Sequence, residues 1–407
     1  MLDRARTRLA VVAVVTVLAA IAFWWLFRWQ HLFDLKIYIA AEKWWLSGHD
    51  LYDFAQPDEL QGKLSFTYPP FAALLFVPLG LLPAPAGYVL LTLGTLACVA
   101  LTTWWLTAAF PSRWYAYGLA LPLILLIEPI RATLSFGQIN MLLVALILAD
   151  LLVALPQGRK WAGVGIGLAA AIKLTPALFI VYLLLSRRTR AALTATATAA
   201  GATLVAALIA PNATRDYWLS ALWDTSRVGR TDYTANQSIN GMLSRLFSPE
   251  KPPTSLWVGL AVAFAVIGLW RATVAARAGD EITGLALTGL TAGLISPITW
   301  VHHLYWFVPA IAALVLAALS ASRPRREWLI LSAAMAYAIC VVGVDTLSDW
   351  GVEQRPTPSL TEFLLRNAFV LLAAALVLFL PVPHAPREVE PDEPGAPETV
   401  FEIRPSA

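Results

Sequence analysis

The segment Phe33-Asp34-Leu35-Lys36-Ile37-Tyr38 follows closely on the first apolar run of the chain, at residues 8–28. If residues 34–47 form a helix, a rotation of about 100° per residue places Asp34 and Tyr38 on one side and Lys36 on the other. A carboxylate on the protein-facing side of a helix beside a membrane is costly unless it is paired or used. Asp34 is therefore a candidate catalytic base. The alternative is that it caps the N-terminus of this helix.

The composition is that of a polytopic membrane protein. Of the 407 residues, 58% are hydrophobic and 14% are charged, against about 25% charged in soluble domains. The arginines lie in short clusters at the ends of apolar runs, which is typical of cytoplasmic anchors and not of a nucleic-acid surface. Cys98 and Cys340 each lie inside an apolar run, so neither a disulfide framework nor a thiolate metal site is expected.

Apolar runs of about 20 residues, shortened where Pro or Gly interrupts them, predict twelve transmembrane helices in one domain at residues 1–381. The predicted spans are 8–28, 86–108, 114–130, 139–155, 161–172, 174–186, 192–210, 255–276, 282–297, 303–320, 327–346 and 363–381. The positive-inside rule places both termini in the cytoplasm, with large outer loops at 29–85 and 211–254. The proline-rich acidic tail at 382–407 is expected to be disordered.

This topology places the unusual polar clusters of the apolar part of the chain on one side, the extracytoplasmic side. Besides Asp34, these clusters contain Glu128, Arg131, Gln138, Asn140, Lys173, Gln237, Asn240, His302 and His303. A transport pathway would instead distribute polar groups through the middle of the membrane. The one-sided arrangement favours a reaction at the outer interface.

Each charged candidate has a structural alternative. Lys173 lies between two short apolar pieces and could either extend to the interface or bind a phosphate. Arg131 could pair with Glu128, three residues earlier, or clamp a phosphate. The neighbours His302 and His303 point in different directions on a helix, so at most one faces a site, and either could be structural.

The polar uncharged candidates are less specific. The amides of Gln138, Asn140, Gln237 and Asn240 suit sugar hydroxyls, although amides are also common helix caps. Tyr68 lies in the rigid turn Phe66-Thr67-Tyr68-Pro69-Pro70 and could shape a cavity or contact a sugar. Most of the outer tryptophans are expected to form an interfacial belt.

Seven motifs in order give the chain a resemblance to a known family. They are Asp34-Leu35-Lys36-Ile37-Tyr38, Gly48-His49-Asp50-Leu51-Tyr52, Phe66-Thr67-Tyr68-Pro69-Pro70-Phe71, Gly137-Gln138-Ile139-Asn140, Ala171-Ile172-Lys173-Leu174-Thr175-Pro176, Asn236-Gln237-Ser238-Ile239-Asn240-Gly241 and Ser296-Pro297-Ile298-Thr299-Trp300-Val301-His302-His303. The series resembles that of the actinobacterial polyprenyl-phosphate-mannose-dependent α-mannosyltransferases that act on phosphatidylinositol mannosides and lipomannan. It covers about three quarters of the chain.

The resemblance implies an all-α, C-type membrane glycosyltransferase fold with an extracytoplasmic active site in the cell membrane. It also implies a polyprenyl-phosphate-mannose donor, a mannosylated lipid or lipoglycan acceptor and an α-(1→2) linkage. The family's essential aspartate falls on Asp34 and its histidine pair on His302 and His303, while Lys173 matches by motif position. Mannose would be transferred with inversion in a single displacement, in which one base suffices because the leaving phosphate needs no protonation. No cofactor and no metal are expected.

Three alternatives remain open from the sequence. A flippase or transporter of lipid-linked sugars commonly has about twelve spans, but this chain shows no internal repeat. A glycosyltransferase that uses another polyprenyl-phosphate sugar, such as arabinose, would fit the same motifs. A structural scaffold of the cell envelope would explain the spans but not the confined polar clusters.

Overall fold

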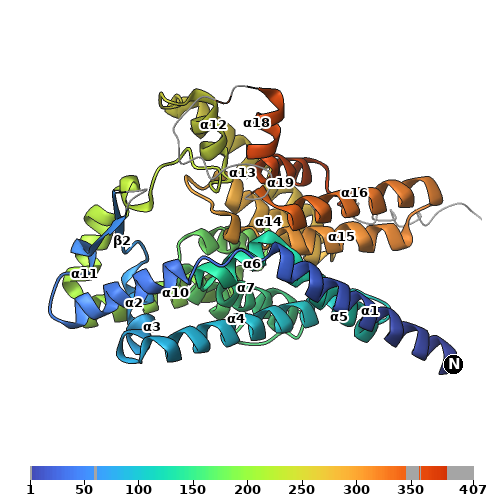
Figure 1. Cartoon of the computed structure of the whole chain (residues 1–407), viewed down its shortest axis with the longest axis horizontal. Helices are drawn as coiled ribbons and strands as arrows, with labels where there is room; N and C mark the ends of the chain where they lie inside the picture. The colour runs from blue at the N-terminus through green and yellow to red at the C-terminus, as the bar shows by residue number, and fades with distance from the viewer. Residues whose placement is uncertain (1, 59–61, 345–356, 358, 383–407) are drawn as a thin grey trace, which may run out of the picture.

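The computed structural model of the chain describes residues 2–58, 62–344, 357 and 359–382 (Figure 1). These residues form helices and one antiparallel hairpin of strands β1 (Ala55–Asp58) and β2 (Gly62–Ser65). The prediction of a helical membrane protein is therefore confirmed, with the hairpin as an addition inside the predicted outer loop 29–85. The predicted disordered tail lies, from residue 383 onward, outside the described residues.

Among the described residues, four helices are long and apolar enough to cross a membrane. They are α1 (Leu2–Leu26), α4 (Ala84–Leu106), α10 (Thr189–Ile209) and α13 (Thr254–Arg277). Large apolar side chains point outward along them; Leu93 is 60% exposed and Leu208 is 84% exposed. Such surfaces are expected where lipid tails are the solvent.

Two bent helix pairs raise the number of possible crossings to six in the described part of the chain. α5 (Arg113–Leu126) meets α6 (Glu128–Phe136) at 63°, and α18 (Leu360–Arg366) meets α19 (Ala368–Phe379) at 76°. The structure thus divides two segments that were predicted to be continuous spans. The first break has a clear cause, because Ile127 is extended and Pro129 has no N–H with which to continue a helix.

The other apolar helices are shorter than the roughly 20 residues that a full crossing needs. They are α3 (Pro70–Leu81), α7 (Asn140–Leu148) with its π-helical extension η3 (Ala149–Ala154), α8 (Val164–Ile172), α9 (Leu178–Leu185), α14 (Glu281–Ile295) and α15 (Phe307–Ser320). A further helix, α16 (Arg323–Val342), packs on α15. The number of twelve crossings therefore stays a prediction.

The close packing of α8 on α10 positions the break at Lys173. A Cβ at Gly163 would lie 2.2 Å from the Ala191 carbonyl oxygen, so only glycine permits this approach. The carboxylate of Asp150 accepts the Ile166 N–H at 2.7 Å and caps the start of α8. The helix ends at Ile172 and Lys173 is extended, which confirms the predicted break between the two apolar pieces.

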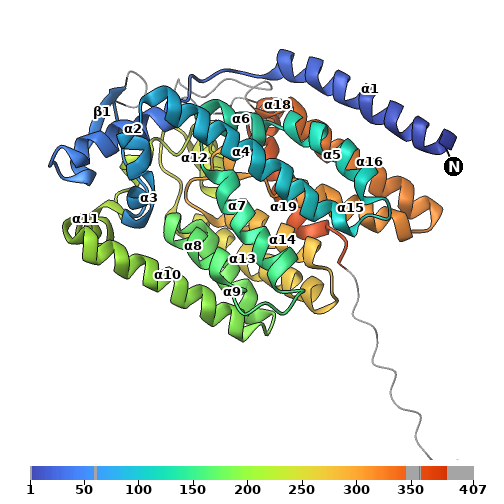
Figure 2. The ribbon, with the colours of Figure 1, turned by 90° about the horizontal axis from the view of Figure 1, so that it is seen from below.

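One end of the molecule, opposite the N-terminus in both views, carries α2, the hairpin and α11, which belong to the predicted outer loops (Figures 1 and 2). The bounds are Phe33–Leu46 for α2 and Pro211–Asp216 for α11; the short helix η1 (Leu51–Asp53) precedes the hairpin in the chain, and η5 (Tyr217–Ala221) follows α11 directly. Contacts join α2 to α3 and to α6, and α6 to the short helix η7 (Val301–His303). Three predicted site segments are thereby brought together.

Candidate active site

Asp34 does not cap α2. The helix begins at Phe33 after Leu32, whose backbone is left-handed (φ 56°), and Asp34 lies in the first turn. Ser135, near the end of α6, fixes the chain before this helix: its carbonyl accepts the Leu32 N–H at 2.9 Å and its hydroxyl accepts the Gln30 N–H at 2.6 Å. The N-cap alternative is therefore excluded.

Gln138 holds the carboxylate of Asp34. A Cβ at Gly137 (φ 71°) would lie 2.7 Å from Cβ of Leu35, so glycine brings this turn against α2. Gln138 Nε2 donates to Asp34 Oδ2 at 2.5 Å, and Gln138 Oε1 accepts the Tyr68 hydroxyl at 3.0 Å. Because both ends of the amide have partners, its nitrogen faces the carboxylate.

The environment of Asp34 suits a general base. The side chain is half-buried. Burial raises the pKa of its carboxyl to about 6, against the opposing effects of the Gln138 hydrogen bond and the charge of Lys173. Such a group is ionised at neutral pH, yet it is basic enough to take a proton from a reacting hydroxyl.

Lys173 turns into the protein and does not extend to the interface. Its Nζ lies 2.8 Å from Nε2 of His303 and donates to Oδ1 of Asn140 at 3.2 Å. The ring centre of Tyr68 is 5.3 Å away. Burial lowers the pKa of Lys173 to about 7, although the charge of Asp34 opposes this shift. The lysine therefore belongs to the same cluster as the candidate base.

The two histidines have different surroundings. His303 contacts Lys173 through Nε2, and its Nδ1 accepts the backbone N–H of Trp300 at 3.2 Å. His302 is 5% exposed, and neither ring nitrogen has a hydrogen-bond partner within the described ranges. The backbone carbonyl of His302 accepts Asn140 Nδ2 at 3.2 Å. His303 is thus the histidine that faces the lysine. The ring nitrogens of His302 can still form hydrogen bonds with a ligand.

Arg131 has backbone partners outside this cluster. Its guanidinium donates to the carbonyl of Leu126 and, at 2.9 Å, to that of Val341, which joins α6 to the end of α16. Nearby, the Glu128 carboxylate accepts the Val344 N–H at 2.8 Å. These contacts give Arg131 a role in helix packing.

The amides of the 236–240 segment hold the loop that leads to His303. Asn236 Oδ1 accepts the Thr299 N–H at 2.9 Å, and Asn240 donates to the Pro297 carbonyl at 3.1 Å. Gln237 is fully buried, donates to two backbone carbonyls and accepts two backbone N–H groups. Its amide capacity is used completely, so we assign Gln237 to the framework of the site and not to sugar binding.

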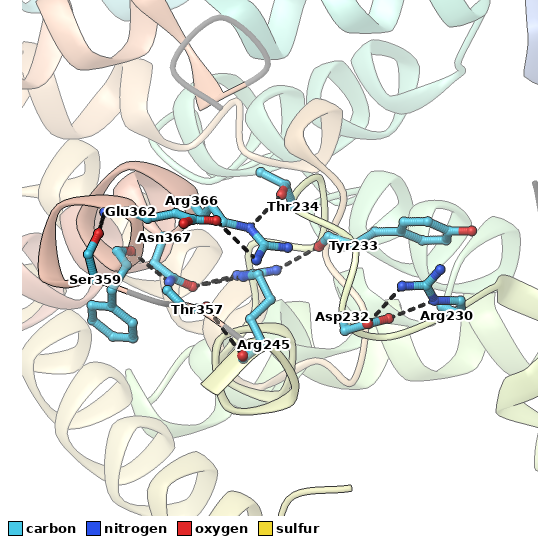
Figure 3. A network of polar contacts seen from close by, with 11 residues as sticks. Arg230, Asp232, Tyr233, Thr234, Arg245, Thr357, Ser359, Glu362, Arg366 and Asn367 are labelled. Carbon is cyan, nitrogen blue, oxygen red and sulfur yellow. Dashed lines mark hydrogen bonds and ion pairs between the residues drawn. The ribbon is translucent and has the colours of Figure 1, made fainter. Parts of the chain in front are cut away.

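Sequence reasoning missed the arginine behind this segment. Arg245, in α12 (Ile239–Phe247), is fully buried and donates to the carbonyl of Tyr233 at 2.6 Å (Figure 3). It donates to the carbonyl of Asn236 at 2.8 Å. It also donates twice to Asn367 Oδ1, at 3.0 and 2.6 Å, at the break between α18 and α19. Arg366 belongs to the same network, because its guanidinium donates to the Thr234 hydroxyl. Its position next to an apolar run was the signal in the sequence that could have revealed this network.

An apolar cavity of about 260 Å³ lies beside the cluster. Its wall includes Pro69 and Leu174, the sequence neighbours of Tyr68 and Lys173, and it continues along the small residues of α10 toward η5. Residues of that far wall include Ala199, Ala200, Thr203 and Trp218. The cavity therefore lies between the segments that carry Tyr68 and Lys173 and a helix that is long enough to cross the membrane.

A model of glycosyltransferase family 87 matches residues 66–297, more than half of the chain. The chain belongs to glycosyltransferase family 87. The predicted enzyme class and the resemblance are thereby confirmed, and this family 87 member is a membrane glycosyltransferase. The family match begins after Asp34 and ends before the histidine pair, so comparison with individual relatives covers more of the site.

Two mycobacterial relatives align over most of this family 87 chain. The polyprenol-phosphate-mannose-dependent alpha-(1-2)-phosphatidylinositol mannoside mannosyltransferase of Mycolicibacterium smegmatis is 31% identical, with 91% of this chain and 89% of the relative covered. The corresponding phosphatidylinositol pentamannoside mannosyltransferase of the same organism is 32% identical, with 78% and 79% covered. The crystal structure of ArnT from Cupriavidus metallidurans, bound to undecaprenyl phosphate, aligns with 92% of this chain and 78% of its own at a TM-score of 0.32 and 16% identity.

Proposed function

We propose that this enzyme transfers mannose from polyprenyl-phosphate-mannose to a mannosylated lipid or lipoglycan acceptor, of the phosphatidylinositol mannoside or lipomannan type, through an α-(1→2) linkage. The observation that carries the proposal is the cluster of a half-buried carboxylate, amine and imidazole next to segments that line an apolar cavity. The activities for which the mycobacterial relatives are named support the choice of donor and acceptor.

Asp34 acts as the general base in a single displacement. Its carboxylate takes the proton of an acceptor mannose hydroxyl while that oxygen attacks the anomeric carbon. The bond between this carbon and the phosphate oxygen breaks, and its electron pair leaves with the polyprenyl phosphate. The anomeric configuration inverts, the phosphate changes from one negative charge to two, and Asp34 holds the proton. One carboxylate suffices because the leaving phosphate needs no proton.

Lys173 and the histidines receive the donor phosphate. Lys173 and His303 present nitrogen donors from one side, and the ring nitrogens of His302 add capacity that the described residues leave unused. Nitrogen donors aimed at the leaving oxygens stabilise the charge that develops there. We leave Arg131 out of this phosphate site because of its backbone partners on α5 and α16.

The apolar cavity takes the first isoprene units of the donor tail. Its wall includes the sequence neighbours of Tyr68 and Lys173, where the phosphate would lie, and its surface is mostly apolar. A prenyl chain leaving the phosphate in that direction would exchange lipid contacts for the small side chains of α10. The expected orientation has the site on the extracytoplasmic side and both termini in the cytoplasm, following the arginine clusters.

Reconstitution tests the proposal. Purified enzyme in proteoliposomes is given labelled polyprenyl-phosphate-mannose and a panel of mannosylated lipids, and the products are analysed by mass and linkage. A new α-(1→2)-linked mannose, formed also in the presence of a chelator, is expected. Transfer from polyprenyl-phosphate-arabinose but not from the mannose donor would reassign the sugar. Movement of donor across the bilayer without a new glycosidic bond would refute the proposal in favour of a flippase.

A further inference from the structure

The amine of Lys173 lies between Asn140 and His303, and other hydrogen bonds fix the orientation of both side chains. Asn140 Nδ2 donates to the His302 carbonyl at 3.2 Å, so Asn140 Oδ1 is the atom that faces the lysine. This oxygen can only accept a hydrogen bond. Lys173 therefore donates one N–H to Asn140.

His303, in contrast, requires a hydrogen-bond acceptor at Lys173. Its Nδ1 lies 3.2 Å from the Trp300 backbone nitrogen and accepts that N–H, so Nδ1 carries no proton. The ring then carries its proton on Nε2, the atom that lies 2.8 Å from Lys173 Nζ. Two N–H groups cannot point at each other across this distance. An ammonium group has three donors and no lone pair, whereas a neutral amine has a lone pair that can accept the Nε2–H.

We propose that Lys173 is an unprotonated amine in the donor-free enzyme and takes up one proton from solvent when the donor phosphate binds. The inference rests on the proposed function, because it assumes that a phosphodiester anion binds at this amine. On binding, the amine becomes an ammonium that donates to a phosphoryl oxygen. The Nε2–H of His303 turns from the amine to another phosphoryl oxygen without any change in its own protonation.

The other titratable groups around Lys173 fit this state. Tyr68 approaches from the segment before α3, and His302 and His303 come from η7. Burial raises the pKa of Tyr68 above the neutral range and lowers the pKa of both histidines, so these three groups are neutral. Asp34, on α2, is the remaining titratable neighbour, and burial raises its pKa as well. Its charge at neutral pH opposes the loss of the lysine proton, but the burial of Lys173 outweighs this effect.

Calorimetry of donor binding tests the inference on the intact enzyme. Polyprenyl-phosphate-mannose is titrated into protein in nanodiscs, without acceptor, in buffers of different ionisation enthalpy between pH 6 and pH 9. The phosphodiester itself does not titrate in this range. We expect uptake of close to one proton per bound donor at pH 8, less at pH 6, and an affinity that falls about tenfold per pH unit above pH 7.

Two variants assign the proton. In Lys173→Arg the side chain is always charged, so uptake at pH 8 should vanish and affinity should become nearly constant with pH. In Asp34→Asn, which removes the neighbouring carboxyl, uptake should persist. Absence of uptake by the wild type at pH 8, or uptake that survives in folded Lys173→Arg and disappears in Asp34→Asn, would overturn the inference. Failure of folded wild-type protein to bind the donor at all would refute the proposed function instead.

Discussion

Gln138 Nε2 donates a hydrogen bond to Asp34 Oδ2 at 2.5 Å, although 104 residues separate the two in the chain. The amide cannot rotate away, because Tyr68 donates to its other end at 3.0 Å. The carboxylate therefore has a fixed direction as well as a raised pKa. Both properties are needed by a base that must meet one hydroxyl of a sugar.

Asp34→Asn should reduce kcat for mannosyl transfer by about 10²–10⁴-fold, which is the usual contribution of a general base. Asparagine preserves the shape of the side chain and can still accept the Gln138 N–H, so folding and donor binding should be retained. Turnover by purified protein is the measurement, with donor affinity and thermal unfolding as controls. Transfer at a near-wild-type rate would remove Asp34 from the mechanism.

Gln138→Met should move the acidic limb of the kcat profile to higher pH. Asp34 works only when deprotonated, so wild-type kcat should fall below about pH 6, tenfold per pH unit. The Gln138 hydrogen bond favours the ionised carboxylate, and its loss raises the pKa further. Activity should therefore drop more at pH 6 than at pH 8.

Tyr38→Phe is the matched control for this shift. The Tyr38 hydroxyl lies 3.2 Å from that of Tyr68 and also interacts with Gln138, but its removal leaves the Gln138 bond to Asp34 in place. The acidic limb should then stay close to that of the wild type. Equal shifts in the two variants, or none in Gln138→Met, would contradict the role given to Gln138.

Ala199→Phe should fill the cavity along α10 and raise KM for a long-chain donor by at least about tenfold, equivalent to 1.4 kcal/mol of lost binding. A donor with a single short prenyl unit does not reach the far wall of the cavity. The KM of Ala199→Phe for this short donor should equal that of the wild type. Gly201→Leu is the control, since a Cβ at Gly201 has no neighbouring atom within 4 Å. If both donors lose activity equally, the cavity does not hold the tail.

Arg245→Met should lower the free energy of unfolding by about 2–5 kcal/mol, because carbonyls of buried backbone lose a charged donor. Chemical denaturation in detergent measures the change. The exposed pair of Arg323 and Glu327 gives the comparison, and Arg323→Gln should change stability by less than about 1 kcal/mol. Similar values for the two variants would show that the network in Figure 3 does not support the fold.

Local pattern predicted the parts of the site that depend on one segment. Helical periodicity placed Asp34 on the inward side, and two short apolar runs that meet near Pro176 indicated the break at Lys173. The contact of Lys173 with His303 joins residues 130 positions apart, and no period in the sequence carries that information. For the same reason, the sequence alone could not decide which of His302 and His303 contacts Lys173.

Residue type alone does not distinguish a polar side chain that binds a ligand from one that supports the fold. The amide of Gln237 looks like a sugar ligand in sequence, yet backbone groups of four residues use its whole hydrogen-bonding capacity. Hydropathy likewise reads residues 114–130 as one span, because the extended Ile127 is as apolar as its helical neighbours. A window average does not detect a single change of backbone conformation.

Gln138 and Asn140 are separated by one residue, yet the first contacts the candidate base and the second contacts Lys173. The distance between proton removal and the departing phosphate is therefore set by a tripeptide and not by the much larger loops around it. Engineering for a different acceptor lipid should leave residues 137–140, Asp34 and Tyr68 intact and alter other residues of the outer loops. A single-residue insertion in this tripeptide should abolish catalysis whatever acceptor is supplied.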